Sequence, residues 1–127
     1  MSSFVLDSSA LLACLNREPG SESLIGTIAG ALLSAVNLAE TMAVLMRQGA
    51  SKEKAVEILD LWDLHVADFN RSLAEETGAL AQRTRSKGLS LGDRACLALA
   101  LSEDLPVVTA DRAWRGVDVG VKIRFIR

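Results

Sequence analysis

Four carboxylates of this chain lie inside apolar stretches, where charged side chains are unusual. They are Asp7 in "FVLDSSALLA", Glu40 in "SAVNLAETMAVL", Asp93 in "LSLGDRACLALA" and Asp111 in "VVTADRAW". Oxygen ligands without a His or Cys partner suit a hard cation, Mg²⁺ or Mn²⁺. Such an ion supports attack of water on a phosphodiester, because it lowers the pKa of the water and stabilises charge on the phosphate. The four acids are therefore candidates for both metal ligands and catalytic residues.

Apolar runs and helix signals indicate the elements that must position these acids. Short apolar runs predict strands at residues 3–6, 31–34, 64–68, 106–109 and 121–126. Helical patterns fall between them, at 10–18, from Ser21, at 37–49, at 51–63, from Asn70 to Gly88 and after Ser90. Ser8 and Ser9 are expected to cap the first of these helices. Strands that alternate with helices predict one α/β domain over residues 1–127 with a mostly parallel sheet.

The four acids occupy equivalent places in this pattern. Asp7 and Asp111 end predicted strands, whereas Glu40 and Asp93 fall in the first turn of predicted helices. In an open parallel sheet these places share the edge formed by the carboxyl ends of the strands, which is where ligands bind. We therefore expect the four carboxylates to meet in one cleft.

Helix capping is an alternative explanation for each acid taken alone. Asn37-x-x-Glu40 and Ser90-x-x-Asp93 both match a capping-box pattern, and Asp7 and Asp111 are also placed to cap. Capping does not account for four acids at one edge, because like charges in one cleft repel unless a cation joins them. The two roles are compatible, since a helix N-terminus favours the ionised carboxylate that a metal requires.

Composition narrows the class of protein. Half of the 127 residues are hydrophobic and the net charge is −2, so the chain has no bulk attraction to nucleic acid or to anionic membranes. Cys14 and Cys96 lie in apolar stretches, as buried thiols of a reducing compartment would. The apolar stretch 24–39 is too short to span a bilayer, and the start of the chain lacks a basic signal region. A cytoplasmic protein is expected.

Taken together, "FVLDSSALLACLNREPG", "VNLAE", "LSLGDRACLALA" and "VVTADRAW" resemble the PIN-domain ribonucleases, most closely the VapC-type toxins of toxin–antitoxin pairs. The resemblance covers nearly the whole chain. It implies a three-layer α/β/α sandwich and an endoribonuclease that depends on Mg²⁺ or Mn²⁺ and inhibits translation. It also implies a homodimer that is inhibited by a cognate antitoxin protein.

Residue by residue, the resemblance assigns acid-ligand roles to Asp7, Glu40, Asp93 and Asp111. It places supporting polar residues at Ser9 and Thr109. Arg94, Arg112 and Arg115 closely follow the acids, and both contacts with RNA phosphates and ordinary helix-surface roles remain open for them. Trp114, the aromatic residue at the end of "VVTADRAW", is expected in the core. His65 is expected to have no catalytic role.

Two other functions remain open at this point. A phosphatase or phosphotransferase could use Asp7 as its nucleophile, although Ser9 stands where the haloacid-dehalogenase-like pattern has a second aspartate. A non-catalytic acidic pocket could instead bind an arginine of a partner protein. Metal-dependent cleavage of RNA by the purified protein would separate the three functions.

Overall fold

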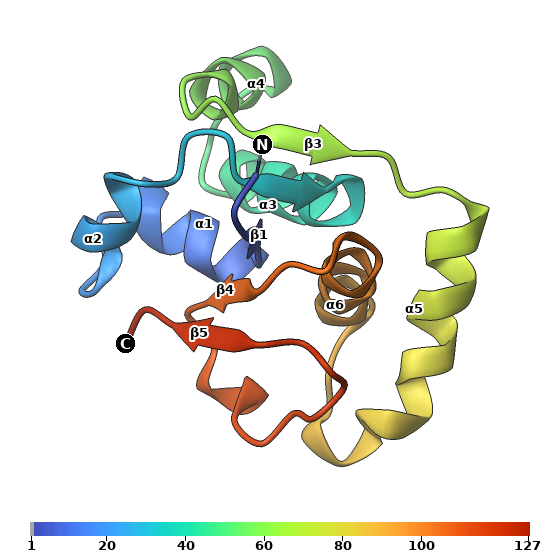
Figure 1. The fold of residues 1–127 in the computed structure, drawn as a ribbon. Coiled ribbons are helices and arrows are strands. Elements are labelled where there is room, and N and C mark those ends of the chain that lie inside the picture. Colours follow the sequence, from blue (N-terminus) through green and yellow to red (C-terminus); the bar gives the residue numbers. More distant parts are fainter. Residues whose placement is uncertain (1) are drawn as a thin grey trace.

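The computed structural model describes residues 2–127 as a five-stranded parallel sheet with helices on both faces (Figure 1). The strands are β1 (Val5–Leu6), β2 (Leu32–Ser34), β3 (His65–Ala67), β4 (Val107–Thr109) and β5 (Ile123–Phe125), in the sheet order β3-β2-β1-β4-β5. The helices are α1 (Ser8–Leu15), α2 (Ser21–Ile25), α3 (Ala35–Arg47), α4 (Lys52–Asp60), α5 (Arg71–Arg83) and α6 (Leu91–Glu103). Two short 3-10 helices follow α5 and β4, at Arg85–Lys87 (η1) and Arg112–Trp114 (η2).

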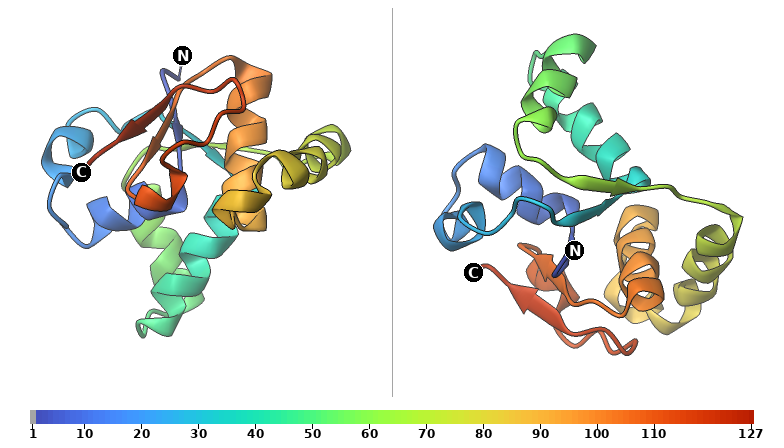
Figure 2. Two further views of the ribbon diagram at one scale, coloured as in Figure 1. Left: turned by 90° about the horizontal axis from the view of Figure 1, so that it is seen from below. Right: turned by 45° about the horizontal axis from the view of Figure 1, so that its top comes forward.

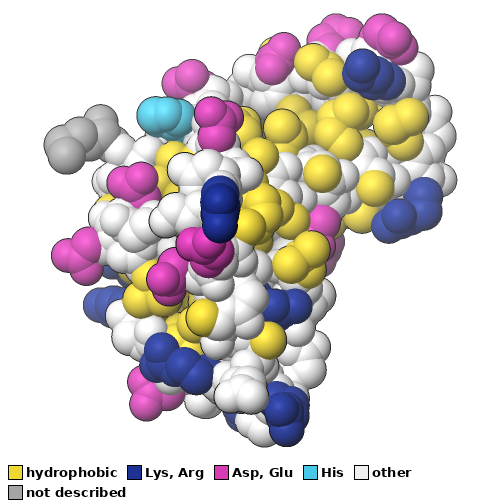
Figure 3. Space-filling view, turned by 90° about the vertical axis from the view of Figure 1, so that its right-hand side faces the viewer, with side chains coloured by type: hydrophobic (Ala, Val, Ile, Leu, Met, Phe, Trp, Pro, Cys, Tyr) yellow, Lys and Arg dark blue, Asp and Glu magenta, His cyan; other side chains and the backbone are white. Residues whose placement is uncertain are grey.

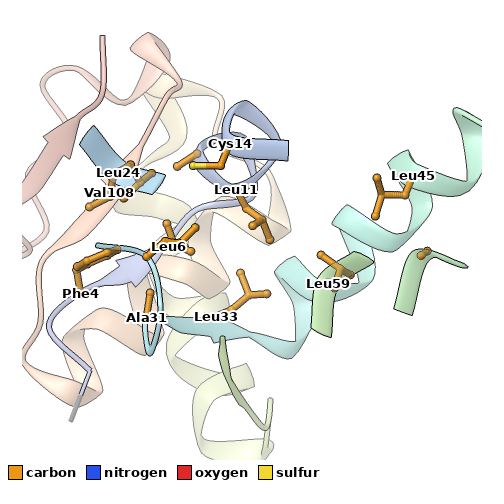
Figure 4. Packing of buried hydrophobic residues seen from close by; sticks show 13 residues of the cluster. Phe4, Leu6, Leu11, Cys14, Leu24, Ala31, Leu33, Leu45, Leu59 and Val108 are labelled. Carbon is orange, nitrogen blue, oxygen red and sulfur yellow. The ribbon is translucent and has the colours of Figure 1, made fainter. Parts of the chain in front are cut away.

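The three central strands are buried on both faces, and this produces three layers. Leu6, Leu33 and Val108 point to one face, where they pack with α1, α2, α3 and α4 (Figure 4). Their strand neighbours Val5, Leu32 and Val107 point to the other face, toward α5 and α6. Because successive side chains of a strand alternate between faces, two apolar residues in a row supply both cores. The predicted α/β/α sandwich with a parallel sheet is confirmed (Figure 2).

Four helix starts agree with the sequence and two differ; α2 begins at Ser21, as predicted. Ser51, Asn70 and Ser90 each accept a backbone N–H at the start of α4, α5 and α6, as predicted. The prediction for the first helix was wrong, because Ser8 and Ser9 lie inside α1 and Asp7 occupies the N-cap position without a side-chain cap bond.

The predicted start of α3 was also wrong. The helix begins at Ala35, where the Ser34 hydroxyl accepts the N–H of Val36, so Asn37 is not its cap. Glu40 consequently lies in the second turn of α3 rather than the first. The reason is that Ser34, the last residue of β2, is itself a good cap and starts the helix directly at the end of the strand.

Helices α3 and α4 project from the body of the molecule (Figure 2). Hydrophobic side chains gather on this projecting part, which is at the upper right of the space-filling view (Figure 3). Met46, Val56 and Val66 are each at least 40% exposed on α3, α4 and the adjoining strand β3, and Leu61 just after α4 is 81% exposed. Among residues 2–127, no helix is both long enough and apolar enough to cross a membrane.

Candidate active site

The four predicted acids line a single pocket at the carboxyl edge of the sheet. The pocket has a volume of about 410 Å³ and is lined by Asp7, Ser8, Ser9, Leu12, Glu40, Ala43, Val44, Arg47, Asp93 and Asp111. The acids come from four different places: the end of β1, the second turn of α3, the first turn of α6, and the segment after β4. The topology therefore brings together residues that are up to 104 positions apart, from 7 to 111, because β1 and β4 are neighbours in the sheet.

Asp7 is the most buried of the four, with only 2% of its surface exposed. Its Oδ2 accepts hydrogen bonds from the hydroxyls of Ser9, at 2.5 Å, and Thr109, at 2.9 Å. Burial raises the pKa of Asp7 to about 6, and the charge of Asp93 adds to the rise, while the two hydroxyls oppose it. Ser9 and Thr109 thus both donate to Asp7, and Thr109 also accepts the backbone N–H of Asp111.

The raised pKa of Asp7 predicts a pH dependence of stability. The folded protein holds this proton more tightly than the unfolded chain, in which the carboxyl has its ordinary pKa of 3.8. The stabilising contribution is therefore complete below the unfolded value and is lost as the pH rises through about 6. Between about pH 5 and about pH 7.5 we expect the metal-free protein to lose about 1 kcal/mol of unfolding free energy through this group. Denaturant unfolding in EDTA at both pH values measures the loss. Asp7→Asn protein should not show this component, and an equal pH dependence in both proteins would contradict the assignment.

Glu40 is held by two donors from different helices. Its Oε1 accepts the hydroxyl of Ser8 at 2.8 Å and the amide of Asn37 at 3.0 Å. The predicted capping box of Asn37 and Glu40 was wrong, because both residues lie within α3 and bond through their side chains.

Asp93 does form the capping box that its sequence predicts. The Ser90 backbone N–H donates to Asp93 Oδ2 at 2.9 Å, and the Asp93 N–H donates to the Ser90 hydroxyl at 3.2 Å. Burial raises the pKa of Asp93, the Ser90 contacts lower it, and the charges of Asp111 and Glu40 raise it further. Asp111 caps η2 by accepting the Ala113 N–H at its Oδ1, at 2.9 Å.

One arrangement is common to all four acids. Each binds the protein through one carboxylate oxygen, which is Oδ2 of Asp7, Oε1 of Glu40, Oδ2 of Asp93 and Oδ1 of Asp111. Within the described chain, the second oxygen of each acid accepts no hydrogen bond, and none of the four belongs to a salt bridge. Fixed carboxylates that repel one another and retain a free oxygen fit a divalent cation, so the donor set matches Mg²⁺ or Mn²⁺.

The acids do not form a complete cage. Across residues 2–127, no three Asp, Glu, His or Cys side chains converge closely enough to hold one ion between them. Asp93 and Asp111 each accept a backbone N–H at a helix start, so one oxygen of each carboxylate is already committed to the protein. Mg²⁺ commonly keeps several waters and takes only one or two carboxylates directly, and this pattern suits a wide pocket.

Sequence reasoning missed three residues that shape the site, namely Ser8, Asn37 and Gly92. Ser8 and Asn37 were interpreted as helix caps, although both hold Glu40. Gly92 lies in the "LSLGD" motif, and a Cβ at this position would overlap the Glu40 carboxylate. A glycine in the first turn of an otherwise apolar helix was the available signal.

The other predicted residues have structural roles or no contact with the pocket. Arg94 donates to the carbonyl of Thr77 at 3.0 Å and so ties α6 to α5. Of the two roles left open for Arg94, this contact favours the structural role on the helix over contact with RNA. Trp114 is fully buried in the core, as predicted, and His65 is exposed on the edge strand β3. Cys14 and Cys96 are both free and buried, and burial raises the pKa of the Cys14 thiol to about 11.

Comparison with known proteins identifies this fold. DNA-bound VapBC from Salmonella typhimurium matches with a TM-score of 0.76 and 20% identity over 100% of both chains. VapC20 of Mycobacterium tuberculosis, described as a Sarcin-Ricin loop cleaving toxin, matches with a TM-score of 0.75 and 19% identity over 94% of this chain and 99% of that one. FitAcB from Neisseria gonorrhoeae matches with a TM-score of 0.72 and 20% identity over 97% of each chain.

At these identities the solved structures establish the fold. A search of curated proteins found no match. The sequence profile of the PIN domain matches residues 4–120, which contain all four acids of the pocket. The chain therefore belongs to the PIN domain family.

Proposed function

We propose that this protein is a cytoplasmic, metal-dependent endoribonuclease that acts as the toxin of a toxin–antitoxin pair and inhibits translation. The observation that carries the proposal is the pocket itself, in which four carboxylates of a PIN domain chain are each held by one oxygen and leave the other free. The Mycobacterium tuberculosis neighbour supports RNA as the substrate, because it is described as cleaving the Sarcin-Ricin loop.

The pocket residues would have different roles in the hydrolysis of a phosphodiester. Asp7, deepest in the pocket, and Asp93 would hold the cation most directly, with Glu40 and Asp111 binding its waters. When bound, Mg²⁺ or Mn²⁺ would lower the pKa of an attacking water and stabilise charge on the phosphate. Ser9 and Thr109 fix Asp7, so its free oxygen keeps one direction. Arg112 and Arg115 are exposed beside Asp111, where they can contact RNA phosphates.

Cleavage of single-stranded RNA by the purified protein tests this proposal. We expect cleavage with Mg²⁺ or Mn²⁺, complete loss in excess EDTA, and recovery when the ion is restored. The control is protein carrying Asp7→Asn from the same preparation route, which excludes a contaminating ribonuclease. Cleavage that survives complete chelation would rule out the metal mechanism. Hydrolysis of a small phosphomonoester without RNA cleavage would favour a phosphatase, and no turnover with either substrate would favour a binding pocket.

The projecting helices α3 and α4 are the proposed partner surface. A second pocket of about 460 Å³ lies there, lined mainly by apolar residues together with Asp60 and Asp63. Several neighbours, including those from Salmonella typhimurium and Neisseria gonorrhoeae, are described as VapBC or FitAB-type proteins, and another as a member of the VapBC family of toxin-antitoxin systems, which supports an antitoxin partner. Exposed apolar area of this kind is costly for a monomer in water.

We expect a dimer when the purified protein is measured by light scattering at high micromolar concentration. Placing a charge on the projecting surface, with Met46→Glu and Val56→Glu together, should shift the mass toward a monomer because the apolar contact is lost. The matched control is Glu76→Lys on the exposed side of α5. A monomeric mass for the unmodified protein would contradict the proposed homodimer.

A further inference from the structure

Asn37 is a fully buried side chain whose hydrogen bonds are unevenly satisfied. None of its surface is exposed, and its Oδ1 has no hydrogen-bond partner in the described chain. A buried acceptor without a partner is costly, and such groups are rare in folded proteins. The contacts of the side chain are therefore those of its nitrogen, and an apolar side chain of similar volume would avoid the cost of the oxygen but lose these contacts.

The Asn37 nitrogen joins three helices behind Glu40, which lines the pocket. Nδ2 lies 3.0 Å from Glu40 Oε1 and 3.1 Å from the carbonyl oxygen of Gly92, so its two N–H groups donate to α3 and α6 at once. The Ser8 hydroxyl of α1 lies 3.0 Å from the same nitrogen and donates to Glu40 Oε1. Glu40 Oε1 is thereby saturated, and Oε2 is the oxygen left for other partners.

Gly92 provides the space that this arrangement needs. A Cβ at this position would overlap both carboxylate oxygens of Glu40, so the carboxylate rests directly against the backbone of α6. Gly92 immediately precedes Asp93 in the chain. The backbone segment that contacts Glu40 therefore also positions the carboxylate of Asp93. The distance between Glu40 and Asp93 across the pocket therefore depends on Asn37 and Gly92.

We propose that Asn37 and Gly92 are positioning residues that set the direction of the free Glu40 oxygen and its separation from Asp93. Neither residue lines the pocket, and both act through Glu40. The inference rests on the proposed function in that the positioned carboxylate serves the divalent cation. Loss of a residue that orients a metal-binding group typically weakens metal affinity by a factor of about 10 to 100.

Three variants separate positioning from simple structural support. In Asn37→Ala protein, the Mg²⁺ concentration for half-maximal RNA cleavage should rise by a factor of about 10 or more. Gly92→Ala should have the same effect on Mg²⁺ dependence and should also lower the melting temperature in EDTA. The added methyl group would displace the Glu40 carboxylate and break its hydrogen bonds with Ser8 and Asn37, which outweighs the better helix propensity of alanine. Thr77→Val is the matched control, because it removes a buried side-chain bond within α5, away from the pocket, and should leave the Mg²⁺ dependence unchanged.

A metal-free measurement tests the contact without relying on catalysis. Melting temperatures in EDTA are compared for Asn37→Ala, Glu40→Ala and the double variant. If Asn37 holds Glu40, the Asn37→Ala change should lower the melting temperature clearly less in the Glu40→Ala background than in the wild type. Additive losses of melting temperature in the double variant would overturn the inference. An unchanged Mg²⁺ dependence of cleavage in both Asn37→Ala and Gly92→Ala proteins would also overturn it. A wild type that neither responds to Mg²⁺ nor cleaves RNA would instead overturn the proposed function, and the melting temperatures would still decide the contact.

Discussion

Replacing Asp7 with asparagine is expected to reduce RNA cleavage by a factor of about 100 or more and to raise the melting temperature of the metal-free protein. Asparagine keeps the size of the side chain, and its oxygen can still accept the hydroxyls of Ser9 and Thr109. The change removes the charge whose burial raises the pKa of Asp7 to about 6. At neutral pH the folded protein holds that charge at a cost of up to about 3 kcal/mol, so its removal should stabilise the protein by several degrees.

The opposite signs of these two effects are what identify Asp7 as a functional residue. Melting temperature in EDTA and in Mg²⁺ should be measured beside the cleavage rate, and added Mg²⁺ should stabilise the wild type more than the variant. Asp118→Asn is a suitable control, because Asp118 is exposed and lies outside the pocket. A variant that is less stable in EDTA and still cleaves RNA at the wild-type rate would return Asp7 to a structural role.

Replacing Asp93 with asparagine should likewise lower cleavage by a factor of about 100 or more, with little change in stability. Asp93 uses Oδ2 for its capping box, and asparagine can accept the same Ser90 N–H through its own oxygen. We expect a loss of roughly 0.5 kcal/mol from the weaker cap, offset by reduced repulsion from Asp111 and Glu40. Metal affinity and cleavage should fall together, because the free oxygen of a charged ligand is lost.

Ser90→Ala provides the matched comparison for Asp93. It removes the hydroxyl that accepts the Asp93 N–H but leaves the carboxylate in the pocket. This variant should lose about 1 kcal/mol of stability and retain cleavage near the wild-type rate. If Asp93→Asn and Ser90→Ala proteins lose stability and activity in parallel, the cap would be the main task of Asp93 and its metal role would be withdrawn.

The sheet and its order of elements were predictable because each strand is a short apolar run followed by a helix signal. Val5 and Leu6 illustrate the point, since one packs on each face of the sheet and both must be apolar. The helix starts were less predictable, because several polar residues near each strand end are equally good caps. Ser34 rather than Asn37 starts α3, and no local feature separates the two.

The sequence was enough to predict that these four acids meet in one pocket, but not which residues orient them. Asp7, Glu40, Asp93 and Asp111 stand out because a carboxylate is rare among apolar neighbours. Ser8 and Asn37 are ordinary polar residues at helix starts, and their contacts join positions 32 and 55 residues apart. Such contacts depend on how α1, α3 and α6 meet in space, which spacing along the chain does not record.

Anomalous diffraction from crystals grown with Mn²⁺ would show whether the pocket of the four acids binds a divalent cation. Mn²⁺ is an accepted substitute for Mg²⁺ at oxygen sites, and its position can be located independently of the protein atoms. We predict an anomalous peak in the pocket at the carboxyl edge of the sheet, within bonding distance of Asp7 and of at least one further acid among Glu40, Asp93 and Asp111. A clear map with no peak in this pocket, under conditions in which Mn²⁺ sustains RNA cleavage, would contradict the account.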